Sequence, residues 1–93
     1  MAELDVEVVA ADHAVWSGTA RRVNAFTVGG DIGVLPGHTP VLSLLAAGRV
    51  EIEPVEGPRV HISADGGFLS VDNDRVTIVA DDAQMVDAPT SSH

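Results

Sequence analysis

Short runs in which apolar and polar residues alternate one by one dominate this chain. Leu4, Val6 and Val8 alternate with acidic residues, and this period of two is typical of a strand with one face on a core and the other in water. Further runs of the same kind lie at 50–53, 59–62, 68–71 and 76–80. At 23–28 both faces carry apolar residues, which indicates a strand covered on two sides.

Turn-forming residues separate these runs. They are Glu56-Gly57-Pro58, Asp65-Gly66-Gly67 and Asp72-Asn73-Asp74, and such residues close hairpins because they accept positive φ or bond their own backbone. Asp72 and Asp74 also resemble the start of a calcium-binding loop, but the glycine and distal glutamate of that loop are missing. The pattern therefore predicts an all-β domain, either a sandwich or a flattened barrel of short strands.

Three segments depart from the alternation. Residues 12–18 are expected to form a connection between strands. Local rules predict a helix over Pro40–Ala47, because Thr39 can cap it, Pro40 suits its first position and Gly48 lies just past its end. From Asp81 onward the alternation is lost and the chain ends in small and polar residues. We therefore expect one domain over 1–83 and a flexible tail over 84–93.

The charge of the chain narrows the choice of partner. Asp and Glu number 14 against 5 basic residues, all of them arginine, for a formal charge of −9. This charge disfavours nucleic acid and anionic lipid and favours a partner with exposed positive charge. The start of the chain is acidic where a signal peptide would be basic, and the longest apolar stretch, 41–47, is far shorter than the ~20 residues of a membrane span. Any membrane association is expected to be indirect.

The sequence offers little for catalysis. His13, His38, His61 and His93 lack the close spacing of metal ligands, and there is no cysteine. The glycine-rich stretch 29–38 is not a phosphate loop, because the chain has no lysine and two prolines follow the glycines. Two interpretations of this stretch stay open: a plain corner of the sandwich, or a rigid exposed loop that contacts another protein. We expect no cofactor.

One family pattern includes the glycine-rich stretch. The sequence Gly30-Asp31-Ile32-Gly33-Val34-Leu35-Pro36-Gly37-His38-Thr39-Pro40-Val41-Leu42 resembles the signature of the epsilon subunit of F-type ATP synthases. Residues 66–71 and 76–81 resemble two further motifs of that family in the expected order. Val15-Trp16-Ser17-Gly18 resembles its actinobacterial members. About 85 residues are covered by the resemblance.

The resemblance implies a fold and a role. The family's amino-terminal domain is a β-sandwich of about ten strands, so Pro40–Ala47 would be extended and not helical. The subunit would be a non-catalytic rotor part of the central stalk, coupling rotation of the c-ring to the gamma subunit and to ATP synthesis. Its place would be the cytoplasmic face of the bacterial membrane, reached only through the c-ring.

The resemblance also implies contact residues. The loop facing the c-ring would consist of Asp31, Ile32, Gly33, Val34, Leu35, Pro36, Gly37 and His38, with Asp31, Gly33 and His38 in contact. The gamma contact would include Pro40, Val41, Leu42, Ser43 and Leu44. Family c-ring loops present arginine, which an acidic partner would complement.

Some properties of the family are not expected here, and two alternatives remain. Typical members continue into a two-helix hairpin that inhibits ATP hydrolysis and in some binds ATP; this sequence stops before it, so neither property is expected of these residues. The first alternative is a free-standing acidic β-sandwich that binds another basic protein. The second is a small metal-dependent hydrolase, which requires His38 and His61 to converge.

Overall fold

The fold is built from strands alone. A computed structural model describes residues 3–86, and these contain nine strands and no helix. The strands are β1 (Leu4–Val9), β2 (Ala14–Thr27), β3 (Gly30–Val34), β4 (Val41–Leu44), β5 (Gly48–Pro54), β6 (Val60–Asp65), β7 (Phe68–Asp72), β8 (Arg75–Val79) and β9 (Asp82–Val86). The all-β prediction is confirmed. Within these residues no helix is long and apolar enough to cross a membrane.

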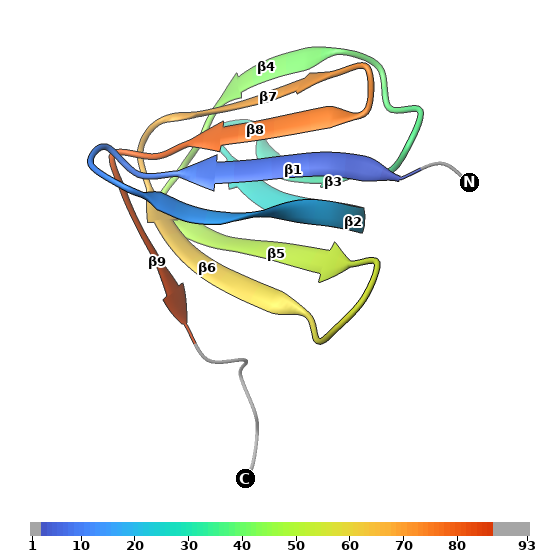
Figure 1. Cartoon of the computed structure of the whole chain (residues 1–93). Coiled ribbons are helices and arrows are strands. Elements are labelled where there is room, and N and C mark those ends of the chain that lie inside the picture. Colours follow the sequence, from blue (N-terminus) through green and yellow to red (C-terminus); the bar gives the residue numbers. More distant parts are fainter. Residues whose placement is uncertain (1–2, 87–93) are drawn as a thin grey trace, which may run out of the picture.

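The strands form one continuous hydrogen-bonded sheet that folds over on itself. Its order is β4-β7-β8-β1-β2-β5-β6-β9, with β3 paired to β2, and Figure 1 shows β4, β7, β8 and β1 above β5 and β6. The long strand β2 joins the two layers, because its first half pairs with β1 and its second half with β5 and β3. Its register shifts between Ala20 and Arg22. We call β4, β7, β8, β1 and the first half of β2 the upper sheet.

The core lies between the layers and is aliphatic. Leu4, Val6 and Val8 are buried as the alternation predicted. The largest fully buried side chains come from several strands of both layers and include Leu4, Ile52, Ile62, Leu69 and Ile78. Full burial of an aliphatic side chain of this size is worth about 1.5–3 kcal/mol. The two layers are therefore held together by packing from both sides.

The predicted turns are confirmed. Gly57, Gly66 and Gly67 have positive φ, as do Asn73 at 50° and Asp74 at 61°. Asn73 and Asp74 are the two central residues between the paired positions Asp72 and Arg75. Two successive residues at positive φ are the signature of a tight hairpin turn of type I′, so this segment is a hairpin and not a calcium loop.

The predicted connection at 12–18 was wrong beyond His13. β2 begins at Ala14, and Ala14–Ala20 pair with β1, with Trp16 opposite Val8. This half of the strand includes small and polar residues, such as Ser17 and Gly18, on an exposed surface. The hydrogen-bonded partner, and not the side-chain pattern, makes it a strand.

The helix predicted over Pro40–Ala47 was also wrong, and the extended form that the family resemblance implied is confirmed. Val41–Leu44 form β4, which pairs with β7 from Val41 opposite Val71 to Leu44 opposite Phe68. Capping and proline signals act within one turn of chain. They carry no information on a pairing partner that lies far away in the sequence.

Two further boundaries differ from the expectation. Gly30–Val34 form β3, an edge strand, and not a loop. A tight turn precedes β3, in which the Thr27 hydroxyl donates to the Gly30 carbonyl at 2.8 Å and accepts from the Gly29 N–H at 3.2 Å. At the other end β9 runs to Val86, so the expected domain end at 83 falls inside this strand. Residues 87–93 of the expected tail lie outside the described residues.

Candidate functional site

The segment between β3 and β4 forms a tight turn. The His38 N–H donates to the Leu35 carbonyl at 3.0 Å, which closes a four-residue turn from Leu35 to His38. Pro36 occupies its second position, and Gly37 occupies the third with φ of 89°. These are the residue types and the conformation of a type II turn. The glycine is required there because other residues rarely adopt this φ.

The structure separates the residues predicted to contact the c-ring into three groups. Four of them are exposed: Asp31, Gly33, Leu35 and Gly37. Three are half-buried, namely Ile32, Pro36 and His38, and one, Val34, is fully buried. Val34 therefore fixes the end of β3 to the core, and the turn that follows it is presented to solvent. Exposed residues alternate with less exposed ones along β3, so Asp31 and Gly33 share its outer face.

Apolar side chains lie exposed beside this turn. On β4, Val41 and Ser43 point inward, whereas Leu42 and Leu44 point outward with 73% and 62% of their surface exposed. Phe68 on β7 is 38% exposed and lies directly opposite Leu44. We call Leu42, Leu44 and Phe68 the apolar patch. These side chains and Ser43 line a hollow of about 400 Å³.

Cross-strand pairing arranges the outer face of the upper sheet in rows of decreasing hydrophobicity. The first row is Leu44, Phe68, Val79 and Val9, the second is Leu42, Ser70, Thr77 and Glu7, and the third is Asp72, Arg75 and Asp5. The apolar patch therefore lies at one end of the face, and the charged residues lie at the other. Such a surface favours one orientation of a bound partner, with the partner's apolar part over the apolar patch and its polar part over the charged residues.

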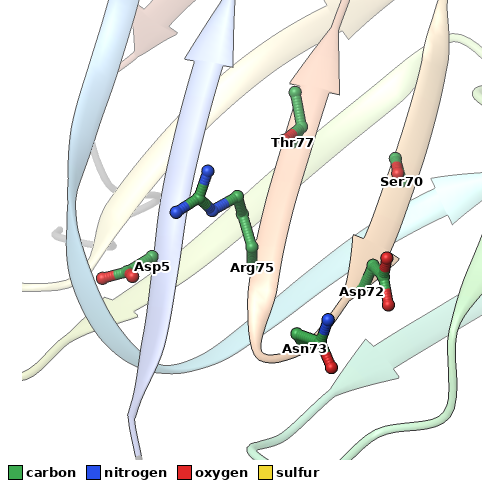
Figure 2. Close-up of a pocket in the computed structure, with 6 residues that line it drawn as sticks. All are labelled: Asp5, Ser70, Asp72, Asn73, Arg75 and Thr77. Carbon is green, nitrogen blue, oxygen red and sulfur yellow. The ribbon is translucent and has the colours of Figure 1, made fainter.

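The polar end of this face is hollowed but holds no catalytic arrangement. Figure 2 shows Arg75 reaching from β8 toward β1 and Asp5, with Ser70 and Asp72 along β7. Together with Asn73 and Thr77 they line a hollow of about 310 Å³. Among these described residues no base lies beside a nucleophile, as nucleophilic catalysis requires. The hollow is a charged corner of the surface.

The histidines face different partners. His38 Nδ1 lies 2.6 Å from the Thr39 carbonyl, whereas His61 Nδ1 is buried on β6, 3.4 Å from a Glu51 carboxylate oxygen. No three metal-binding side chains gather anywhere in residues 3–86. His13 lies 2.6 Å from Asp12, and this hydrogen bond, together with the attraction of the imidazole, lowers the pKa of the exposed Asp12. The metal-dependent alternative finds no site in the described part of the chain.

Comparison with known proteins decides the family. Residues 3–86 match the sequence family described as the β-sandwich domain of the ATP synthase delta/epsilon chain. The chain belongs to this family. The ATP synthase epsilon chain of Micrococcus luteus is 51% identical over 88 residues, which are 95% of this chain and 97% of that protein. The epsilon chain of Rhodococcus erythropolis is 50% identical over 86 residues, which are 91% of this chain and 70% of the relative.

Solved structures of ATP synthases contain the same fold. A chain in the Euglena gracilis mitochondrial enzyme superposes with a TM-score of 0.84 at 25% identity, covering 91% of this chain and 54% of that one. A chain in the central stalk and c-ring of the Tetrahymena thermophila enzyme gives 0.73 at 15% identity, with 86% and 64% covered. This chain thus spans less than two thirds of either. As a member of the epsilon chain family, it is a non-catalytic subunit of the ATP synthase complex.

Sequence reasoning missed two residues beside the predicted contact segment. Phe68 completes the apolar patch, and Asp74 bonds the turn at Gly37. Both lie more than twenty residues away along the chain. An exposed aromatic residue at the start of a strand was a visible signal for Phe68, but only the register of β4 against β7 places it beside Leu44.

Proposed function

We propose that this epsilon chain couples the c-ring to the gamma subunit, with the apolar patch against gamma and the turn Leu35–His38 against the ring. The apolar patch carries the proposal. A chain of charge −9 exposes Leu42, Leu44 and Phe68 together on one face, next to a turn stiffened by proline. Contiguous exposed apolar residues on a charged surface mark a protein contact.

The apolar patch has the composition of an interface core. It continues onto Val28, which is 68% exposed and whose N–H donates to the Leu44 carbonyl at 3.0 Å. Such cores are depleted in charge and enriched in aromatic and apolar side chains, and their rims are polar. The rows of hydroxyl and charged residues beyond the apolar patch supply such a rim. A broad contact of this kind suits a partner that must turn with the subunit as one body.

The turn and the outer face of β3 suit a second, more polar partner. Asp31, Gly33 and Gly37 are exposed there, and His38 lies at the end of the turn. The family resemblance implies a ring of loops bearing arginine, which exposed Asp31 would attract. A subunit in this position would belong to a bacterial enzyme on the cytoplasmic face of its membrane and would reach that membrane only through the ring.

The experiment replaces an apolar side chain of the apolar patch by a charged one. Leu44→Asp adds a charge at a position already exposed to water, so the fold should persist while the affinity for purified gamma subunit falls at least tenfold. Ser63→Asp, exposed on the outer side of β6, adds the same charge elsewhere and should bind gamma normally. Equal binding by both variants, measured by calorimetry, contradicts the proposal.

A further inference from the structure

The turn Leu35–His38 is bonded to a distant hairpin by one side chain. The Gly37 N–H donates to the Asp74 carboxylate at 2.7 Å, although the two residues lie 37 positions apart. Among the described residues, this is the one recorded hydrogen bond that joins segment 35–40 to another part of the chain. Every other hydrogen bond of that segment stays within it.

The Gly37 N–H is well placed to donate to an acceptor outside the turn. A type II turn closes through the N–H of its fourth residue, here His38 bonded to the Leu35 carbonyl. The N–H of the third residue, Gly37, is therefore free to point away from the turn. Gly37 is exposed, so water could also accept from this N–H, but water would not hold the turn in one orientation. Asp74 supplies a fixed acceptor.

The acceptor is itself held on both sides. Asn73 and Asp74 form the tight turn between β7 and β8 with φ of 50° and 61°, and the Asp74 carbonyl accepts from the Asp5 N–H of β1 at 2.8 Å. The carboxylate thus extends from a point where three strands of the upper sheet meet. A hydrogen bond to a charged acceptor is about twice as strong as one between neutral groups.

We infer that Asp74 is the positioning residue that fixes the turn Leu35–His38 to the upper sheet. A mechanical load on the turn is then passed to β1 and β8 and does not bend segment 35–40. The inference rests on the proposed function, in which this turn contacts the c-ring. Without the carboxylate, the segment between buried Val34 and half-buried Val41 keeps only its internal bonds. The turn would keep its shape but lose its fixed orientation.

The first test measures the bond in the isolated chain. Asp74→Gly keeps a residue that accepts positive φ and removes the carboxylate, whereas Asp74→Asn keeps both the positive φ and an oxygen acceptor. By NMR, amide exchange at Gly37 should be at least tenfold faster in Asp74→Gly and about threefold faster in Asp74→Asn. Ile78, buried on β8, serves as the unchanged reference. An exchange rate at Gly37 equal to that of the wild type in both variants overturns the inference. If Asp74→Gly does not fold, the exchange rate in Asp74→Asn decides.

The second test measures what the bond does for the contact. Binding to purified c-ring in detergent should weaken about tenfold in Asp74→Gly and recover to within threefold of wild type in Asp74→Asn. Recovery by the asparagine variant separates a positioning role from a general loss of structure. Faster exchange at Gly37 with unchanged ring affinity overturns the positioning role. If the wild-type chain itself does not bind the ring, the proposed function fails, and the exchange experiment still decides whether Asp74 holds the turn.

Discussion

At Gly67 the chain comes so close to the end of β8 that a side chain has no room. A Cβ placed there would lie 1.8 Å from the Val79 carbonyl oxygen and 2.7 Å from the Ala80 Cα, both backbone atoms, and φ is 94°. The carbonyl of Gly67 also accepts from the Leu45 N–H at 3.0 Å. This residue therefore ties together β4, β7 and β8.

Gly67→Ala should lower the free energy of unfolding by at least about 3 kcal/mol, because the methyl group must displace backbone and strain a left-handed residue. Gly57→Ala is the matched control: its φ is 97°, but nothing lies within 4 Å of the added Cβ. It should cost only about 1–2 kcal/mol. Urea unfolding followed by the fluorescence of Trp16, the single tryptophan in a chain without tyrosine, measures both. Equal losses would show that backbone strain alone matters at Gly67.

His61 is a polar side chain with an unused hydrogen-bonding atom. It is 6% exposed, and its Nδ1 makes no hydrogen bond in the described structure, although a Glu51 carboxylate oxygen lies 3.4 Å away in poor geometry for one. A buried polar atom without a partner costs about 1–3 kcal/mol. His61→Leu, which keeps a similar volume, should therefore leave the free energy of unfolding unchanged or raise it by about 1 kcal/mol at neutral pH. A loss above about 2 kcal/mol would contradict the absence of a partner for the imidazole.

At the scale of elements, β4 pairs along its length with β7, and on its other edge the Leu44 carbonyl accepts from the Val28 N–H. The Leu45 N–H points to Gly67 at the start of β7, and since successive N–H groups alternate in direction along a strand, that of Ser43 points the same way. The N–H of Leu42 points to the other edge. Proline lacks this donor, so the two positions should respond differently.

Ser43→Pro should lower the free energy of unfolding by about 2 kcal/mol and loosen β4, because it removes a bond of the ladder with β7. Leu42→Pro should be tolerated within about 1 kcal/mol, because edge strands accept proline where the N–H faces water. Thermal unfolding of the two variants provides the comparison. Equal destabilisation would show that the ladder with β7 does not dominate the stability of β4.

The same elements show how far the sequence alone reaches. Alternation predicted β1, β5, β6 and β8 because one face of each strand is core and the other is water. In β3 the signal was present as Ile32 and Val34, but glycine in place of a polar residue at Gly33 weakens the alternation. In β4 the exposed residues are leucines and the inward position between them is Ser43, so the alternation is reversed and local capping signals favour a helix.

The candidate site was predictable only in its continuous part. The segment 31–44 could be selected from its motif, and its exposure and proline-stiffened turn agree with a contact role. Phe68 and Asp74 join it through strand pairing and through one side-chain bond across the fold. Neither relation is encoded in local spacing, because each depends on the order in which the strands lie in the sheet.

At the scale of the whole molecule, charge should govern the approach to a basic partner. Asp31→Arg reverses an exposed charge on β3 and should reduce ATP-driven proton pumping by inverted membrane vesicles about fivefold while ATP hydrolysis continues. Asp65→Arg changes the net charge equally but lies exposed at the end of β6, and its pumping should match wild type. The same loss in both variants would mean that net charge, and not the position of Asp31, controls coupling.

The parallel pairing of β1 with β8 sets the order of events when the chain is made. Val6 lies beside Val76 and Val8 beside Ile78, so β1 pairs with a strand that is made about 70 residues later. Contacts between distant segments slow folding, and an unpaired strand invites association with other chains. β8 must be made before the sandwich can close, and a nascent chain stalled earlier would leave one side of β1 open to pairing with a strand of another chain.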